Sequence, residues 1–422
     1  MRSIPIGLVL FAAIALQTIP ASAQDSVYYN QRRDKLLSLL ADDEAALIPG
    51  AWEKELETFR QSNNFFYFTG VVQPNLLLLI APASRSPEVL YLPARNLADG
   101  SLSEAWTGSK LGPGSGTEKI TGIARAAERG TFNTVFAGLA AGLTTVYYDY
   151  LPSEIGGPRS GAEVLLATIT ERYPHLQIRP LGRLVDSLRM VKDETEIATL
   201  QRAVDITGEA LVEAIGAVKA GMYEYEVEAL IEYGLHRRGS QRPGFPSIVG
   251  AGPNTVTLHY NENRRRIESG ELLLMDVGAE LDYYTADITR TVPVDGKFTA
   301  RQREVYDIVL RAQQAGIAAV RPGVTLRDIH AAAKKVIEEA GFGEYFIHYT
   351  SHYLGMNVHD VGSRDEKLRA GMVITVEPGI YLPEESLGVR IEDDVLVTEN
   401  GSRVLSRNIP STVDELEGLM AR

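Results

Sequence analysis

The segment ESGELLLMDVG, residues 268–278, decides the fold because it returns as RAGMVITVEPG at residues 369–379. The similarity continues on both sides of this pair. Upstream, GAVKAG at 216–221 matches AAVRPG at 318–323, and downstream, ADITRTVPVDG at 286–296 matches IEDDVLVTENG at 391–401. These offsets of 101 to 105 residues are too long for a solenoid repeat. The sequence therefore predicts two α/β halves, each reading helix, helix, strand, hairpin and strand, that pack about a pseudo-two-fold axis.

Matching positions in the two halves carry acidic residues. Asp276 aligns with Glu377, and Asp287 aligns with Glu392. The first pair lies in near-continuous apolar runs typical of strands covered on both faces, where an uncompensated carboxylate is costly. No four basic residues recur at matching spacing, whereas two divalent cations would balance four carboxylates. We therefore expect a dinuclear metal site, with His352 as its nitrogen ligand.

The donor set indicates the metal and the reaction. Oxygen ligands with one nitrogen favour Mn²⁺, with Co²⁺, Fe²⁺ and Zn²⁺ as alternatives. Two such ions would hold a bridging hydroxide and polarise a carbonyl, so the expected reaction is hydrolysis. Arg390 precedes Glu392 by two residues, and on a strand both side chains would share one face. The guanidinium would then fix a metal-binding carboxylate.

Composition and charge exclude several classes of protein. The chain has 422 residues, of which 45% are hydrophobic, and this is ordinary globular usage. Its 55 acidic and 42 basic residues give a net charge of −13, which disfavours a nucleic-acid binder. Because there is no cysteine, thiolate catalysis and thiolate metal ligands are excluded. His, Asp and Glu remain as the candidate metal ligands.

The N-terminus has the pattern of an export signal. Arg2 precedes an apolar run from Ile4 to Leu16, and Ala21-Ser22-Ala23 has the small-residue pattern of a cleavage site. The run is shorter than the roughly 20 residues that span a bilayer. We expect residues 1–23 to be a signal peptide cleaved before Gln24, and the mature protein to be periplasmic or secreted, without a membrane partner.

Two domains follow in the mature chain. A helix at residues 32–40 and strands at 45–49, 65–69, 76–80 and 89–92 predict a mixed α/β domain over residues 24–185. The pattern changes near Val185. Residues 186–422 contain the repeat, and we expect them to form the catalytic domain.

Four segments of this domain resemble the signature segments of the metal-dependent "pita-bread" aminopeptidases. They are LLLMDVGAELDYYTADITRT (272–291), HYTSHYLGMNVHDVG (348–362), ITVEPGIYL (374–382) and GVRIEDDVLVT (388–398). Within this group the chain is similar to the Xaa-Pro aminopeptidase (aminopeptidase P) family, and residues 32–80 look like that family's N-terminal domain. The resemblance implies a C-terminal pita-bread domain of two pseudo-symmetric halves and covers nearly all of the mature chain.

The resemblance also implies roles for individual residues. The implied ligands of two metal ions are Asp276, Asp287, His352, Glu377 and Glu392, with Asp287 and Glu392 bridging the ions. Glu377 would also move the proton. His259 would contact the scissile region near the leaving nitrogen, His359 would stabilise the tetrahedral oxygen, and His348 would help form the proline-side pocket. Tyr381 and Arg390 match positions close to the site.

The implied substrates are peptides with proline in the second position, and relatives that form dimers or tetramers imply a homo-oligomer. An Xaa-Pro bond lacks an amide hydrogen and has a rigid ring, so a shaped pocket and protonation of the leaving group are needed. The chain departs from the family pattern in two short segments, between Gly341 and His348 and between Tyr381 and Val389. Both could border the substrate cleft.

Two alternatives remain open at this point. An Xaa-Pro dipeptidase, or prolidase, shares every metal ligand with the aminopeptidases. A non-catalytic pita-bread binding module would be expected to have lost ligands, and this chain retains all five.

Overall fold

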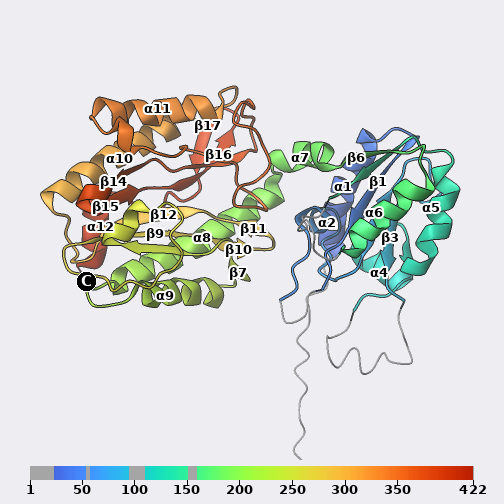
Figure 1. Cartoon of the computed structure of the whole chain (residues 1–422), viewed down its shortest axis with the longest axis horizontal. Helices are drawn as coiled ribbons and strands as arrows, with labels where there is room; N and C mark the ends of the chain where they lie inside the picture. The colour runs from blue at the N-terminus through green and yellow to red at the C-terminus, as the bar shows by residue number, and fades with distance from the viewer. Residues whose placement is uncertain (1–22, 54–57, 95–109, 151–158, 422) are drawn as a thin grey trace, which may run out of the picture. The chain divides into compact units, whose positions relative to one another are not determined.

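The computed structural model describes residues 23–53, 58–94, 110–150 and 159–421, which form two compact units that divide between Val185 and Asp186 (Figure 1). Nearly all of the expected signal peptide, residues 1–22, lies outside the described residues. Within the described part of the chain, no helix is both long and apolar enough to cross a membrane.

The first unit is built on a mixed six-stranded sheet in the order β4-β3-β2-β1-β5-β6. Strand β1 lies at its centre, antiparallel to β2 and parallel to β5, and its inward residues are fully buried. The strands are β1 (Glu44–Pro49), β2 (Leu77–Ile80), β3 (Glu88–Leu92), β4 (Ala126–Glu128), β5 (Thr145–Tyr148) and β6 (Gln177–Pro180). The helices are α1 (Ala23–Leu39), α2 (Asn63–Thr69), α4 (Ser115–Thr121), α5 (Phe132–Ala140), α6 (Gly161–Arg172) and α7 (Gly182–Met190), of which α7 crosses the boundary between the units.

One predicted strand of this unit is wrong, because residues 65–69 belong to helix α2. A short apolar run does not distinguish a strand from a buried helix by its periodicity. The deciding residue is Gly70, which adopts a left-handed conformation with φ of 64° and donates its N–H to the carbonyl of Phe66. All residues from Phe65 to Thr69 are buried, so the continuous apolar run reflects a helix enclosed by the fold.

The second unit contains the two predicted halves. The first half comprises α8 (Glu194–Ala217), α9 (Glu224–Arg237), β7 (Arg242–Pro243), β8 (Ile248–Ala251), β9 (Leu272–Val277), β10 (Ala279–Leu281), β11 (Tyr284–Thr285) and β12 (Ile288–Pro293). The second comprises α10 (Ala300–Ala319), α11 (Leu326–Glu339), β13 (Val373–Val376), β14 (Gly379–Leu382), β15 (Leu387–Arg390), β16 (Asp393–Thr398) and β17 (Gly401–Val404), and α12 (Val413–Met420) follows.

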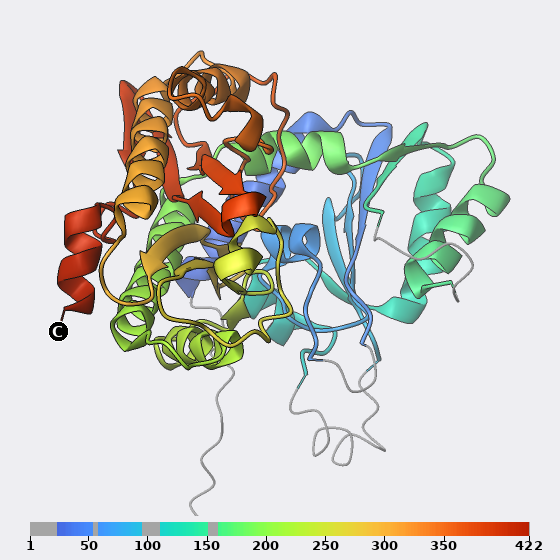
Figure 2. The same cartoon turned by 60° about the vertical axis from the view of Figure 1, so that its left-hand side comes forward.

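The structure confirms the repeat. Helix α11 begins and ends 102 residues after α9, and in each half an antiparallel strand pair follows the helices, β9 with β12 and β13 with β16. Helices α8 and α9 cover one side of these strands, and α10 and α11 cover the other (Figures 1 and 2). This is the expected mixed α/β architecture with a pita-bread domain.

One hydrophobic cluster contains residues of both halves. It includes Leu211 of α8, Ile231 of α9, Met275 of β9, Val305 of α10 and Ile337 of α11. Every residue of β9 is buried, as the apolar run around Asp276 predicts. The acidic residues of the repeat therefore lie at the junction of two halves that share one interior.

Candidate metal centre

The four repeated carboxylates lie at the ends of strands, where the two halves meet. Asp276 is in β9 and faces Thr289 of the antiparallel strand β12, while Asp287 immediately precedes β12. Glu377 follows β13 directly, and Glu392 directly precedes β16. The Glu392 N–H donates to the carbonyl of Thr289 over 3.2 Å, so the backbones of the two halves are joined at this point.

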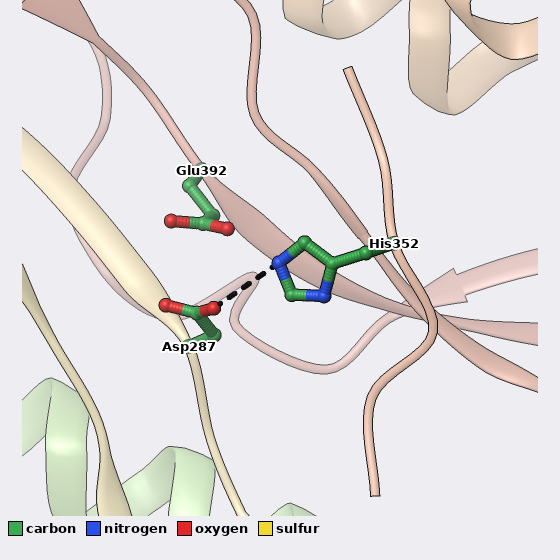
Figure 3. Close-up of side chains that lie close together, drawn as sticks. All are labelled: Asp287, His352 and Glu392. Atoms are coloured by element: carbon green, nitrogen blue, oxygen red, sulfur yellow. Dashed lines mark ion pairs between the residues drawn. The ribbon is translucent and has the colours of Figure 1, made fainter. Parts of the chain in front are cut away.

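His352 faces the carboxylates of Asp287 and Glu392 (Figure 3). Its Nδ1 lies 3.1 Å from the carbonyl of Tyr353, and because a carbonyl only accepts, we assign the ring hydrogen to Nδ1. The lone pair of Nε2 then points at Asp287 Oδ2, 3.4 Å away, and at Glu377 Oε1, 3.6 Å away. His352, Asp287 and Glu392 form the compact group, with one ligand atom from each within 4.8 Å of the others.

This arrangement fits a cation. A neutral imidazole lone pair and two carboxylate oxygens face one another with no hydrogen to share between them. Among the described residues, Asp276 Oδ1 and Asp287 Oδ1 are buried and have no hydrogen-bond partner. Buried polar atoms without partners are rare, and a metal ion would satisfy them. The donor set of carboxylates and one imidazole suits a divalent first-row metal.

Burial and mutual repulsion shift the pKa values of the candidate ligands. Burial and the charges of Glu392 and Asp276 raise the pKa of Asp287 well above its usual value. Burial, with the charges of Glu377 and Asp276, likewise raises the pKa of Glu392. Burial raises the pKa of Glu377 to about 8, although Arg390 acts in the opposite direction. These directions show that the positive charge of Arg390 does not offset the burial and mutual repulsion of these carboxylates.

Two of the imidazoles at the site, those of His352 and His348, are neutral at physiological pH. Burial, with the charge of His359, lowers the pKa of His352 to about 4. Burial, with the charge of Arg390, lowers the pKa of His348 to about 3. A neutral ring is the form that binds a metal.

Arg390 is the one guanidinium that contacts the side chain of a predicted ligand within the described residues. Its Nη2 lies 2.6 Å from Asp276 Oδ2, and Nε donates to Thr289 Oγ1 over 3.1 Å. Thr289 Oγ1 in turn donates to Glu392 Oε2 over 2.7 Å. The expected support of a carboxylate by Arg390 is present, and it acts directly on Asp276 and through Thr289 on Glu392. Burial would lower the pKa of Arg390, but the neighbouring charges of Tyr381 and Asp276 raise it.

A hydrogen-bonded chain connects Arg390 to the histidine expected in the proline-side pocket. Arg390 Nη1 donates to the Tyr381 hydroxyl over 3.1 Å, and this hydroxyl lies 2.9 Å from His348 Nε2. His348 Nδ1 lies 2.9 Å from the carbonyl of Tyr349, which assigns the hydrogen to Nδ1 and lets Nε2 accept from Tyr381. The orientation of His348 is therefore fixed at both nitrogens.

All the predicted site residues line one cavity of about 680 Å³ in the second unit: His259, Asp276, Asp287, His348, His352, His359, Glu377, Arg390 and Glu392. The rings of His352 and His359 meet edge to face with centroids 4.4 Å apart. His259 and His359 are exposed to this space, whereas the ligand carboxylates lie deeper. The cavity also has apolar walls, to which Phe245, Ile248 and Val358 contribute.

Three supporting residues were missed by the sequence reasoning. Thr289 bridges Arg390 and Glu392, and Asp394 accepts the N–H of Asp287 over 3.1 Å. Both lie within the matched segments of the repeat, which could have drawn attention to them. No pattern in the sequence pointed to Glu224, yet its buried carboxylate accepts from the Ala251 N–H, the Tyr260 hydroxyl and the Arg265 N–H. It thereby holds the segment that carries His259.

The chain is similar to known peptidases over most of its length. Residues 198–399 match metallopeptidase family M24, and residues 29–147 match the aminopeptidase P N-terminal domain. The Xaa-Pro aminopeptidase of Escherichia coli K12 is 33% identical over 441 aligned positions, covering 93% of this chain and 97% of that protein. The solved structure of E. coli aminopeptidase P with the inhibitor Pro-Leu has a TM-score of 0.83 and 31% identity, covering 94% of this chain and 98% of that one. The Xaa-Pro dipeptidase of Pyrococcus furiosus is 39% identical over 235 residues, which are 55% of this chain and 67% of that protein.

Proposed function

This chain belongs to metallopeptidase family M24 and carries an aminopeptidase P N-terminal domain, and on that premise we propose that it releases the first residue of peptides whose second residue is proline. Membership of the family makes it a metal-dependent peptidase. The observation that carries the finer proposal is the convergence of His352 and carboxylates from both halves in one cavity. The similarity of the chain to an Xaa-Pro aminopeptidase over 93% of its length supports the bond before proline as the one that is cleaved.

We propose that two divalent metal ions, Mn²⁺ in the first instance, are held by Asp276, Asp287, His352, Glu377 and Glu392. Bound there, such ions lower the pKa of a water molecule and polarise the scissile carbonyl. The protein's own contribution is to fix the donors. Arg390 orients Asp276, and Thr289 orients Glu392.

Glu377 is the proposed proton shuttle. Its carboxylate lies at the cavity, with Oε1 3.6 Å from His352 Nε2 and Oε2 3.8 Å from His348 Nδ1. A carboxylate in this position can accept a proton from the attacking water and return it to the leaving nitrogen. The proline nitrogen must be protonated to depart, because an unprotonated amine anion is a poor leaving group.

The remaining histidines face the substrate space. We propose that His259 contacts the scissile region beside the leaving nitrogen and that His359 stabilises the tetrahedral oxygen. His348, oriented by Tyr381, lines the wall against which the proline ring would pack. The shape of this wall would favour a rigid ring over a flexible side chain.

The test is hydrolysis by Mn²⁺-loaded protein of a tripeptide Xaa-Pro-Yaa, with the matched Xaa-Ala-Yaa as a control. We expect release of free Xaa from the proline peptide and much slower release from the alanine peptide. Protein that binds Mn²⁺ but cleaves neither peptide, or both equally, would refute the proposed specificity.

A dipeptidase is the second candidate, because an Xaa-Pro dipeptidase is 39% identical over 55% of this chain, whereas the Xaa-Pro aminopeptidase is 33% identical over 93% of it. The same assay with the dipeptide Xaa-Pro separates the two. Faster cleavage of the tripeptide supports an aminopeptidase, whereas a preference for the dipeptide supports a prolidase.

We further propose export to the periplasm or the medium, with cleavage before Gln24. The mature chain would consist of an N-terminal aminopeptidase P-type domain over residues 24–185 and a catalytic domain over 186–422, and it would form a homo-oligomer. The small-residue motif before Gln24 supports export. N-terminal sequencing of protein recovered from the periplasmic or secreted fraction tests cleavage, and an uncleaved N-terminus would refute it. Light scattering of the purified protein tests the assembly.

A further inference from the structure

We propose that Arg290 is a positioning residue of the metal centre, and that its guanidinium sets the spacing between Asp287 and Glu392 from behind the site. This inference rests on the proposed function, because it assumes that these two carboxylates share metal ions. Arg290 itself does not touch the cavity.

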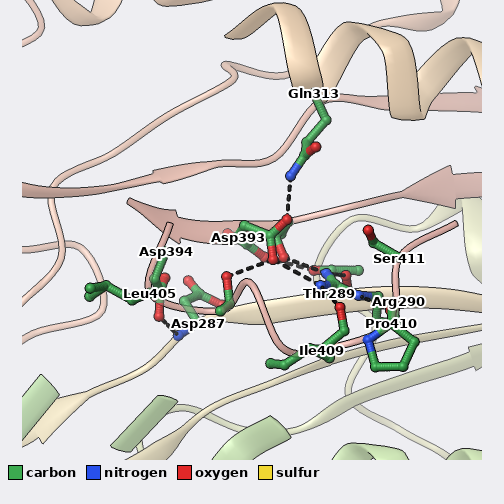
Figure 4. Close-up of polar contacts among 12 residues, drawn as sticks. Asp287, Thr289, Arg290, Gln313, Asp393, Asp394, Leu405, Ile409, Pro410 and Ser411 are labelled. Carbon is green, nitrogen blue, oxygen red and sulfur yellow. Dashed lines mark hydrogen bonds and ion pairs between the residues drawn. The ribbon is translucent and has the colours of Figure 1, made fainter. Parts of the chain in front are cut away.

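Arg290 is fully buried and makes five hydrogen bonds, four of them to backbone carbonyls (Figure 4). Nη1 donates to the carbonyls of Thr289 over 2.9 Å and of Glu392 over 2.7 Å. Nε donates to the carbonyl of Pro410 over 2.7 Å, and Nη2 donates to that of Ile409 over 3.2 Å. The guanidinium therefore joins β12, the start of β16 and the segment before α12.

The charge of this guanidinium is balanced within the core. Nη2 lies 2.8 Å from Asp393 Oδ1, which also accepts from Ser406 Oγ over 2.6 Å. The other oxygen of Asp393 accepts from Gln313 of α10. The ion pair is thus anchored to a helix of the second half, so Arg290 and Asp393 form a rigid point of reference.

The connection from this point to the metal ligands is short. Arg290 holds the backbone carbonyl of Glu392, and Thr289, the residue before Arg290, holds the Glu392 side chain through its hydroxyl. Asp287 lies two residues before Thr289, and its N–H donates to Asp394, the neighbour of Asp393. Glu392 is therefore held by Arg290 and its neighbour Thr289, and Asp287 is held by Asp394, the neighbour of Asp393.

A planar fork is required for this geometry. Guanidinium presents five donors in fixed directions, whereas a lysine ammonium presents three on a flexible stem. A lysine at position 290 could pair with Asp393 but could not also hold the carbonyls of Thr289, Glu392 and Pro410. Loss of groups that orient metal ligands typically weakens metal binding about 10–100-fold.

The experiment compares Arg290→Lys and Arg290→Met with the control Tyr306→Phe. Tyr306 is equally buried, and its hydroxyl donates to the carbonyl of Ser411 over 2.7 Å, in the same C-terminal segment that Arg290 holds. The control therefore loosens that segment without touching Thr289 or Glu392. Full-length, metal-free proteins are titrated with Mn²⁺ by calorimetry, and the rise in Tm at saturating Mn²⁺ is measured for each.

We expect the dissociation constant for Mn²⁺ to rise at least tenfold in Arg290→Lys and to stay within about twofold of wild type in Tyr306→Phe. Arg290→Lys keeps the buried charge, so it carries the test if Arg290→Met fails to fold. Wild-type affinity in a folded Arg290→Lys protein, or equal weakening in Tyr306→Phe, would overturn the proposal. If wild-type protein itself binds no Mn²⁺, the proposed metal centre fails instead.

Discussion

Replacing Asp360 with asparagine should destabilise the second unit and loosen the segment that carries His359. The Asp360 side chain is 1% exposed and lies 2.5 Å from Arg189 Nη2 and 3.2 Å from Lys192 Nζ. Both cations are themselves buried. Asparagine has the same shape, but it removes the carboxylate charge that both buried cations contact, and its amide NH₂ would face a donor.

The expected magnitude follows from the burial of all three groups. Removing one partner of a buried ion pair costs about 3–5 kcal/mol, because the remaining charge is uncompensated. For a unit of this size, each kcal/mol lowers Tm by about 2–4 °C. We therefore expect the transition of the second unit to fall by roughly 6–20 °C.

The matched control is Asp365→Asn, the same chemical change five residues along the chain. Asp365 pairs with Arg327 on the surface, where both side chains are more than half exposed. Its Tm should be indistinguishable from that of wild type, because water screens the pair. Differential scanning calorimetry at one scan rate measures all three proteins. Equal Tm values for the two variants would refute the reasoning.

The effect should also depend on pH in one direction. Burial alone would raise the pKa of Asp360, but Lys192 and Arg189 outweigh it and lower the pKa below its usual value. A carboxylate with a lowered pKa stabilises the fold at neutral pH and loses that contribution as the pH falls. The Tm difference between wild type and Asp360→Asn should therefore be full above about pH 4 and shrink below it.

Four further outcomes test the site. Asp287→Ala should remove one proposed metal ligand, and elemental analysis should find less bound metal than in wild type; an unchanged metal content would contradict the ligand assignment. Glu377→Ala should abolish peptide hydrolysis, and retained turnover would exclude it as the shuttle. Because the pKa of Glu377 is raised to about 8 in the metal-free protein, metal binding must displace protons, so calorimetry should find tighter Mn²⁺ binding at pH 8 than at pH 6. Glu224→Gln should lower kcat/KM more than it changes Mn²⁺ affinity, because it disturbs the segment around His259 and no metal ligand.

The repeat and its acidic positions could be predicted from the sequence because short apolar runs and their spacing reveal them. Apolar runs around Asp276 and before Glu377 indicate buried strands, and the similar offsets of 101 to 105 residues indicate that both occupy equivalent places. The convergence of four carboxylates followed from that symmetry, whereas His352 was chosen from the histidines of the region and the full set of five ligands was implied by the family resemblance. Helix α2, predicted as a strand, shows the limit of the same method, since the five buried residues from Phe65 to Thr69 have no polar face to reveal their period.

The supporting contacts could not be read in advance because they join residues that are far apart in the chain. Arg290 and Pro410 are separated by 120 residues, and Arg390 and Asp276 by 114. The spacing of Arg390 and Glu392 predicted that Arg390 would support a carboxylate. It could not identify Asp276 as the direct partner, because Asp276 lies on a strand of the other half. Thr289 is a common residue in strands, and only the three-dimensional arrangement reveals that its hydroxyl serves Glu392.

The position of the carboxylates at the junction of the halves bears on how such a protein could arise. Each half of the second unit supplies two of the four carboxylates. A polypeptide that contained only one half would therefore carry only two of them. It could build a comparable centre by associating with an identical copy, as symmetric dimers do. After fusion of the two copies, each half could diverge. The compact group shows such a difference, because its one histidine, His352, comes from the second half and the first half contributes none.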